Sequence, residues 1–193
     1  MNRFEDRGAY LIDLVDEVLV RCPSCGKAAR VACEAPIWRN EPRVSCGNCG
    51  FERRGWVLTQ GEISVRTEKR RCPRCGRWLG QRSIRNLTKA GKVVRACPCG
   101  AEVPAEVTKS ITIGAPVDPW FRYPVWLQRR FRDELLWAYN RRHLLFLRDY
   151  VAADLRQRQP RRKGSLASCL PQWLKSGTDR EAILKSIESL LED

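Results

Sequence analysis

Apolar residues in the last third of the chain recur at helical spacing. Asn140 is a favourable N-cap residue, and Pro160 would stop a helix, so the pattern predicts a helix running from there to about Gln159. Intervals of three and four residues place the apolar side chains on one face. The residues on this face are Leu144, Leu147, Val151 and Leu155.

Two shorter helices are expected after a basic connector at 160–164. Ser165 can cap the first, which would end at Gly177. The run Thr178-Asp179-Arg180-Glu181 matches a capping box and would open the last helix. The apolar residues of the two helices are Leu170, Trp173 and Leu174, and then Ile183, Leu184, Ile187 and Leu190.

The first half of the chain has short runs rich in Val, Ile, Thr and Trp, which are typical of strands. A turn near Lys89–Lys92 would join two of these runs into a hairpin. The strand candidates are Trp56–Thr59, Trp78–Leu87, Lys92–Ala96 and Val103–Ile113. The predicted fold class is therefore a small α+β chain, with short antiparallel strands first and a helical region at the C-terminal end.

An aromatic, proline-rich stretch separates the two halves. Three prolines between 114 and 126 disfavour both an α-helix and the hydrogen bonds of a β-sheet. Four aromatic side chains there are too apolar for a solvent-exposed flexible linker, so we expect the stretch to pack against the rest of the protein. These side chains are Trp120, Phe121, Tyr123 and Trp126. The predicted organisation has four segments, at 1–61, 62–113, 114–139 (the aromatic linker) and 140–193.

The cysteines of the strand-rich half form an internal repeat. Cys22-Pro-Ser-Cys25-Gly recurs 50 positions later as Cys72-Pro-Arg-Cys75-Gly. Cys46-Gly-Asn-Cys49-Gly recurs as the shorter Cys97-Pro-Cys99-Gly. The near-constant offset indicates a tandem unit of about fifty residues, each with two cysteine pairs.

Paired thiolates at this spacing are typical of tetrahedral zinc sites. The repeat predicts that each unit closes on itself and holds one structural Zn²⁺. The predicted ligands are Cys22, Cys25, Cys46 and Cys49 in the first site, and Cys72, Cys75, Cys97 and Cys99 in the second. Disulfides, ligand pairs crossed between the units, iron in place of zinc, and a ligand swap involving Cys33 are the alternatives. Cys33 and Cys169 are otherwise expected to be small buried hydrophobic residues.

The net charge of +14 is concentrated in the cysteine region and in the segment after it. Residues 22–113 carry 18 Lys and Arg against 7 Asp and Glu. A basic surface of this kind favours polyanionic partners, and a hairpin would bring many of its side chains to one face. The predicted nucleic-acid contacts are Arg70, Arg71, Arg74, Arg77, Trp78, Arg82, Arg85, Lys89, Lys92 and Arg95. Trp78 could stack on a base or pack under its own hairpin, and the sequence favours packing.

Nucleic-acid binding through the phosphate backbone is the leading functional hypothesis, and an adaptor that docks on an acidic protein is the alternative. No catalytic constellation stands out, so we expect neither an enzyme nor a small-molecule substrate. His143, the single histidine, is expected to pack or cap the long helix. With no apolar run long enough for a membrane and no secretory leader pattern, a cytoplasmic protein is predicted.

The cysteine knuckles resemble the zinc ribbons of transcription factors and RNA-polymerase subunits. The segments 136–144, 150–156 and 165–175 are similar to the helical tail of a group of uncharacterised bacterial tandem zinc-ribbon proteins. This resemblance would cover nearly the whole chain and implies a bacterial, cytosolic setting, without an established activity. The short Cys97-Pro98-Cys99 knuckle departs from the usual two-residue spacer.

Overall fold

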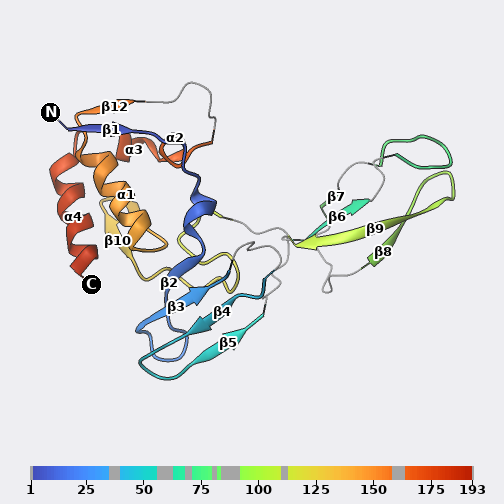
Figure 1. The fold of residues 1–193 in the computed structure, drawn as a ribbon, viewed down its shortest axis with the longest axis horizontal. Helices are drawn as coiled ribbons and strands as arrows, with labels where there is room; N and C mark the ends of the chain where they lie inside the picture. Colours follow the sequence, from blue (N-terminus) through green and yellow to red (C-terminus); the bar gives the residue numbers. More distant parts are fainter. Residues whose placement is uncertain are drawn as a thin grey trace. The chain divides into compact units, whose positions relative to one another are not determined.

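The computed structural model describes residues 2–34, 40–55, 63–67, 71–79, 82–83, 92–109, 113–157 and 164–192. The protein is an α+β chain that divides into two compact units (Figure 1). Unit 1 comprises residues 1–55 and 113–193, and unit 2 comprises residues 56–112. The first cysteine unit and the helical region, which the sequence treats as separate segments, therefore belong to one body.

The first sheet belongs to unit 1 and has four antiparallel strands in sequential order. These are β2 (Glu17–Arg21), β3 (Ala28–Ala32), β4 (Arg43–Ser45) and β5 (Glu52–Arg54). Alternation buries one face, with Val18 and Val20 on β2, Val31 on β3 and Val44 on β4 all 0% exposed. Because the side-chain period of a strand is two, these valines fix the register of the sheet.

The segment predicted to be an aromatic linker completes this sheet. On the outer edge of β2, the N–H of Arg21 donates to the Pro124 carbonyl at 2.8 Å and the N–H of Trp126 donates to the Leu19 carbonyl at 2.8 Å. The N–H of Leu19 donates to the Tyr139 carbonyl at 2.7 Å. An edge strand that would otherwise present unpaired backbone groups is thereby covered.

The expected packing of the aromatic stretch is confirmed, since Trp120 and Phe121 are 1% and 4% exposed. Asp118, fully buried, organises the turn: its carboxylate accepts the N–H groups of Trp120, Phe121 and Tyr123 at 2.9, 2.7 and 2.6 Å. Burial nevertheless raises the pKa of Asp118, against the lowering effect of these N–H donors. The stretch 114–139 also contains a hairpin, β10 (Gln128–Phe131) with β11 (Glu134–Trp137), which the linker assignment missed.

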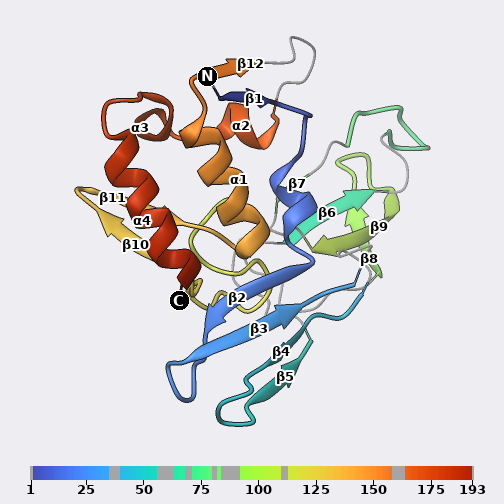
Figure 2. The same ribbon diagram turned by 60° about the vertical axis from the view of Figure 1, so that its left-hand side comes forward.

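The described part of unit 1 also contains four helices. They are α1 (Arg141–Ala152), α2 (Leu166–Cys169), α3 (Gln172–Lys175) and α4 (Arg180–Glu192), preceded in the chain by a 3₁₀ turn at Leu11–Leu14. α1 packs against α4, and α4 packs against β10 (Figure 2). Their shared core includes Leu144, Leu147, Val151, Ile183, Ile187 and Leu190.

The predicted caps are confirmed at two helix starts. The Asn140 side chain accepts the N–H of His143 at 2.9 Å, and the Ser165 hydroxyl accepts the N–H of Ser168 at 3.2 Å. The single helix expected after Ser165 is two short ones, because Pro171 interrupts it.

The long helix is shorter than predicted. α1 ends at Ala152, and Leu155–Gln157 form strand β12, which pairs in parallel with β1 (Arg3–Glu5). The N–H groups of Asp154 and Leu155 donate to the Asn2 carbonyl at 2.9 and 3.2 Å. Leu155, expected on the inward face, is therefore 46% exposed.

Unit 2 contains an antiparallel sheet with strand order β7-β6-β9-β8. Its strands are β6 (Ile63–Thr67), β7 (Arg82–Ser83), β8 (Lys92–Ala96) and β9 (Glu102–Lys109). β8 confirms the predicted strand at 92–96. The predicted hairpin of 78–87 with 92–96 is wrong, because β7 and β8 lie on opposite edges with β6 and β9 between them. The candidate strand at 56–59 lies outside the described residues.

Candidate metal centres and the basic surface of unit 2

Every cysteine pair lies in a tight reversal of the chain. In unit 1, Cys22 and Cys25 lie between β2 and β3, and Cys46 and Cys49 lie between β4 and β5. In unit 2 the first pair lies between Arg71 and Trp78, which form an antiparallel bridge, and the second pair lies between β8 and β9. The strands thus deliver two turns to one end of each sheet.

Three of the four turns share the same backbone hydrogen bonds. The N–H of the first cysteine donates to the carbonyl five residues later at 2.8–2.9 Å, and the glycine N–H returns to the carbonyl of that cysteine at 2.9–3.0 Å. The glycines have φ of +68 to +73°, a conformation that side chains with a Cβ adopt at a cost. They are Gly26, Gly50 and Gly76.

The short fourth turn keeps this geometry with one residue fewer. The N–H of Cys97 donates to Ala101, four residues on, at 2.8 Å, and the N–H of Gly100 donates to the Cys97 carbonyl at 2.8 Å. Gly100 again has a positive φ of +81°. The missing residue is thus absorbed by a tighter turn, and both cysteines still face the same centre.

The structure brings the cysteines together in the quartets that the spacing predicts. In each quartet all four sulfur atoms lie within 4.8 Å of one another. The closest pairs are Cys22–Cys49 at 3.7 Å and Cys25–Cys46 at 3.6 Å, and Cys72–Cys99 at 3.7 Å and Cys75–Cys97 at 3.6 Å. A tetrahedron with metal–sulfur bonds of about 2.3 Å has edges of about 3.8 Å, so the donor set fits a zinc-sized ion.

Backbone N–H groups point toward the sulfur atoms. A hydrogen bond from the Lys27 backbone is the largest influence on Cys25, whose pKa is lowered to about 6. Burial raises the pKa of Cys72, but the N–H groups of Cys75 and Arg74, together with neighbouring sulfurs, lower it to about 6. The Asn48 amide, which sequence reasoning missed, also donates to the Cys25 sulfur at 3.5 Å. These donors spread the negative charge that a four-thiolate centre accumulates.

The two remaining cysteines differ from each other. Cys33 is 3% exposed, as predicted, and burial raises the pKa of its thiol to about 11. Within the described residues it belongs to neither quartet. The prediction of a buried Cys169 is wrong, because this side chain is exposed at the end of the short helix α2.

The first turn of unit 2 carries an exposed aromatic and basic surface. Trp78 is 57% exposed, so the packing favoured by the sequence is wrong for this side chain. The Arg71 guanidinium lies 5.8 Å from the centre of the Trp78 ring and donates to the Gly76 carbonyl at 3.1 Å. Arg74 and Arg77 are exposed on the same turn. We call Arg71, Arg74, Arg77 and Trp78 the knuckle surface.

The other predicted contact residues divide into two groups. Arg82 lies in β7, and Lys92 and Arg95 lie in β8, on opposite edges of the sheet. The predicted single row of cations is therefore interrupted by β6 and β9. Arg70, Arg85 and Lys89 lie outside the described residues.

His143 is 3% exposed, which confirms its packed position in the first turn of α1. Its Nδ1 accepts the Tyr139 N–H at 3.3 Å, and the Trp137 ring packs edge-on at 5.6 Å. Burial lowers the pKa of His143 to about 4, so the ring is neutral at pH 7.

Comparison with protein-family models, with curated proteins and with solved structures finds no match to this chain. The resemblance to bacterial tandem zinc-ribbon proteins therefore stays a prediction. Of the helices that the structure describes, none has the length and apolar character needed to cross a membrane.

Proposed function

We propose that the protein is a binding module in which two structural zinc ions hold two ribbons, and that unit 2 binds the backbone of nucleic acid. The two cysteine quartets support the metal assignment, because four thiolates fill a tetrahedral shell and leave no open position for a reactant. Each zinc would hold the turns of its own sheet in register.

The exposed Trp78 beside Arg71 is the observation that carries the nucleic-acid proposal. An aromatic ring that is more than half exposed gives up part of the stabilisation that burial would supply. A base stacked on the ring would cover it and restore that stabilisation. The neighbouring guanidiniums of Arg74 and Arg77 would contact phosphates on either side.

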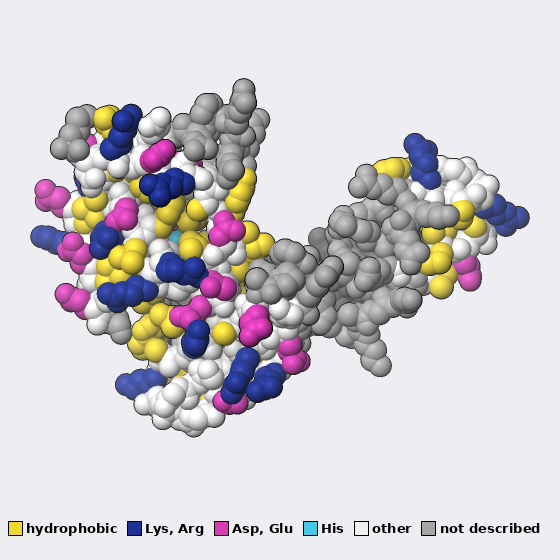
Figure 3. All heavy atoms as spheres, viewed as in Figure 1, with side chains coloured by type: hydrophobic (Ala, Val, Ile, Leu, Met, Phe, Trp, Pro, Cys, Tyr) yellow, Lys and Arg dark blue, Asp and Glu magenta, His cyan; other side chains and the backbone are white. Residues whose placement is uncertain are grey.

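The charge distribution favours the same surface. Unit 2 has twelve Lys and Arg against four Asp and Glu, a net +8, whereas the larger unit 1 has 24 against 18, a net +6. On the face of unit 1 seen in Figure 3, acidic and basic side chains are interspersed and form no continuous basic field. Attraction to a polyanion would therefore act mainly on unit 2.

The test is a salt titration of binding to a random-sequence, fluorescein-labelled single strand, as DNA and as RNA, followed by anisotropy. Arg77→Gln should lower the slope of log K against log salt by about 1, because one phosphate contact is lost. Arg7→Gln, which removes an exposed charge from unit 1, should leave the slope unchanged. Trp78→Leu should weaken binding about 5- to 160-fold by removing one stacked base.

Two outcomes would overturn the proposal. One is the absence of binding at low salt in the zinc-loaded protein, which would favour the acidic protein partner. The other is an equal effect of Arg77→Gln and Arg7→Gln, which would mean that only net charge matters.

A further inference from the structure

Unit 1 contains a pocket of about 740 Å³. Its lining is mainly apolar, unlike the basic surface of unit 2. The 3₁₀ turn, β11, α1, α2, α3 and the backbone at 113–116 contribute to its walls. Its lining includes Leu11, Leu135, Trp137, Leu147, Leu170 and Trp173. Small-molecule sites in proteins have volumes of about 300–1,000 Å³ and are lined mainly by such side chains.

His143 places one polar group in this apolar lining. Its Nδ1 accepts the Tyr139 N–H, so the proton of the neutral ring is on Nε2. Among the described residues Nε2 has no hydrogen-bond partner, although the side chain is 3% exposed and lines the pocket. This nitrogen is not among the described buried side-chain atoms that lack a partner, so solvent reaches it through the pocket, and a ligand with an acceptor atom would take the place of that water.

The charge of the pocket limits what it can hold. Within the described lining there is no Lys or Arg, and Glu134 adds a carboxylate. Phosphates and other anions would therefore gain no ion pair here, in contrast to unit 2. An extended peptide would need a row of backbone partners, whereas the described lining consists mainly of apolar side chains with a few polar groups, among them His143 and Tyr10.

We propose that this pocket binds an uncharged, largely apolar small molecule whose carbonyl oxygen accepts the Nε2–H of His143. The inference does not depend on nucleic-acid binding by unit 2. The sequence did not predict such a ligand. The apolar residues of the pocket come from five separated segments, so they form no local motif.

Nile red is a suitable probe, because it is uncharged, apolar and carries one ring carbonyl. The zinc-loaded full-length protein should bind one equivalent, with a rise and blue shift of fluorescence. Leu135→Trp, which adds bulk at the pocket wall, should weaken binding at least tenfold. The control is Leu155→Trp: this residue is similarly exposed, at 46% against 39%, but lies outside the lining, so its binding should match wild type. Equal affinity in both variants, or uptake that does not saturate near one equivalent, would overturn the proposal.

A second measurement locates the probe. Because His143 is the only histidine, ¹⁵N-histidine labelling gives a single imidazole spin system. Saturating Nile red should shift the Nε2 resonance and slow exchange of its proton, while the sulfonate dye 8-anilinonaphthalene-1-sulfonate, an apolar anion, should bind at least tenfold more weakly. An unmoved Nε2 signal at saturation would show that the dye binds elsewhere and that the proposal is wrong.

Discussion

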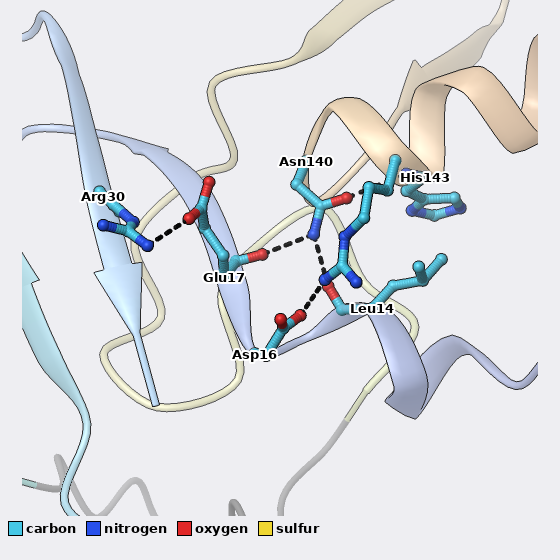
Figure 4. A network of polar contacts seen from close by, with 7 residues as sticks. Leu14, Asp16, Glu17, Arg30, Asn140 and His143 are labelled. Carbon is cyan, nitrogen blue, oxygen red and sulfur yellow. Dashed lines mark hydrogen bonds and ion pairs between the residues drawn. The ribbon is translucent and has the colours of Figure 1, made fainter. Parts of the chain in front are cut away.

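Asn140 connects the first sheet to the helices, and its replacement by aspartate tests that role. The side chain is 3% exposed. Its oxygen caps α1 through the His143 N–H, while its amide nitrogen donates to the carbonyls of Leu14 and Glu17 at 2.6 and 2.7 Å (Figure 4). Arg142, two residues on from Asn140, forms an ion pair with Asp16. One amide thus satisfies groups on two elements more than 120 residues apart in sequence.

The variant Asn140→Asp would keep the cap, since aspartate and asparagine are equally good N-cap residues. It would, however, place a carboxylate oxygen against two carbonyl oxygens that have lost their donor. Each buried acceptor left unsatisfied costs about 1–3 kcal/mol, so the free energy of unfolding should fall by about 2–6 kcal/mol. If Asn140 were only a cap, the substitution would be nearly neutral.

The assay is urea unfolding at pH 7.5 with saturating zinc, followed by circular dichroism at 222 nm, because every helix that the structure describes lies in unit 1. Gln172→Glu, the same amide-to-carboxylate change on an exposed side chain, is the control and should stay within about 0.5 kcal/mol of wild type. A loss below about 0.5 kcal/mol for Asn140→Asp would refute the proposed connection.

Three further predictions concern pH, metal and the end of α1. Between pH 6.5 and 4 the unfolded chain binds a proton at His143 that the folded chain excludes, so stability should fall as pH is lowered, by about 3 kcal/mol at pH 4. His143→Leu should remove that part of the pH dependence in parallel urea titrations, and an unchanged slope would contradict the assignment. Cys72→Ser should reduce bound zinc from two equivalents to one and unfold unit 2, while the 222 nm signal persists. The described core of unit 2 is Cys72, Leu79, Cys97 and Val103. Loss of the 222 nm signal would contradict the two-unit division. Leu155→Glu should change the free energy of unfolding by less than about 0.5 kcal/mol, whereas Val151→Glu, at a buried position, should unfold unit 1. Equal effects of the two substitutions would support the longer helix that the sequence predicted.

Local signals were sufficient for the parts of the fold that depend on neighbouring residues. The cysteine spacing predicted both quartets, because each turn is closed by residues within five positions of its first cysteine. The caps at Asn140 and Ser165 were predicted for the same reason, since a cap bonds to an N–H three residues away.

Long-range pairing explains the errors. No residue near Leu155 indicates that this part of the chain will pair with Arg3. The helical spacing of the preceding apolar residues also continues past Ala152, where α1 ends. The pairing of β6 with β9 likewise displaces the expected hairpin in unit 2. The exposure of Trp78 was mispredicted because composition favours burial of tryptophan, whereas unit 2 has a small described core to receive it.

The outer edge of β2 also has a consequence for how the chain is made. The four cysteines of the first quartet have all been synthesised by position 49, but Pro124, where the covering segment begins, follows 75 positions later. A growing chain that emerges from the ribosome can therefore load its first metal while β2 still presents open backbone groups. Until the covering segment is synthesised, the open edge of β2 can pair with strands of other chains. Rapid metal binding would shorten the time before the turns between the strands are held in place.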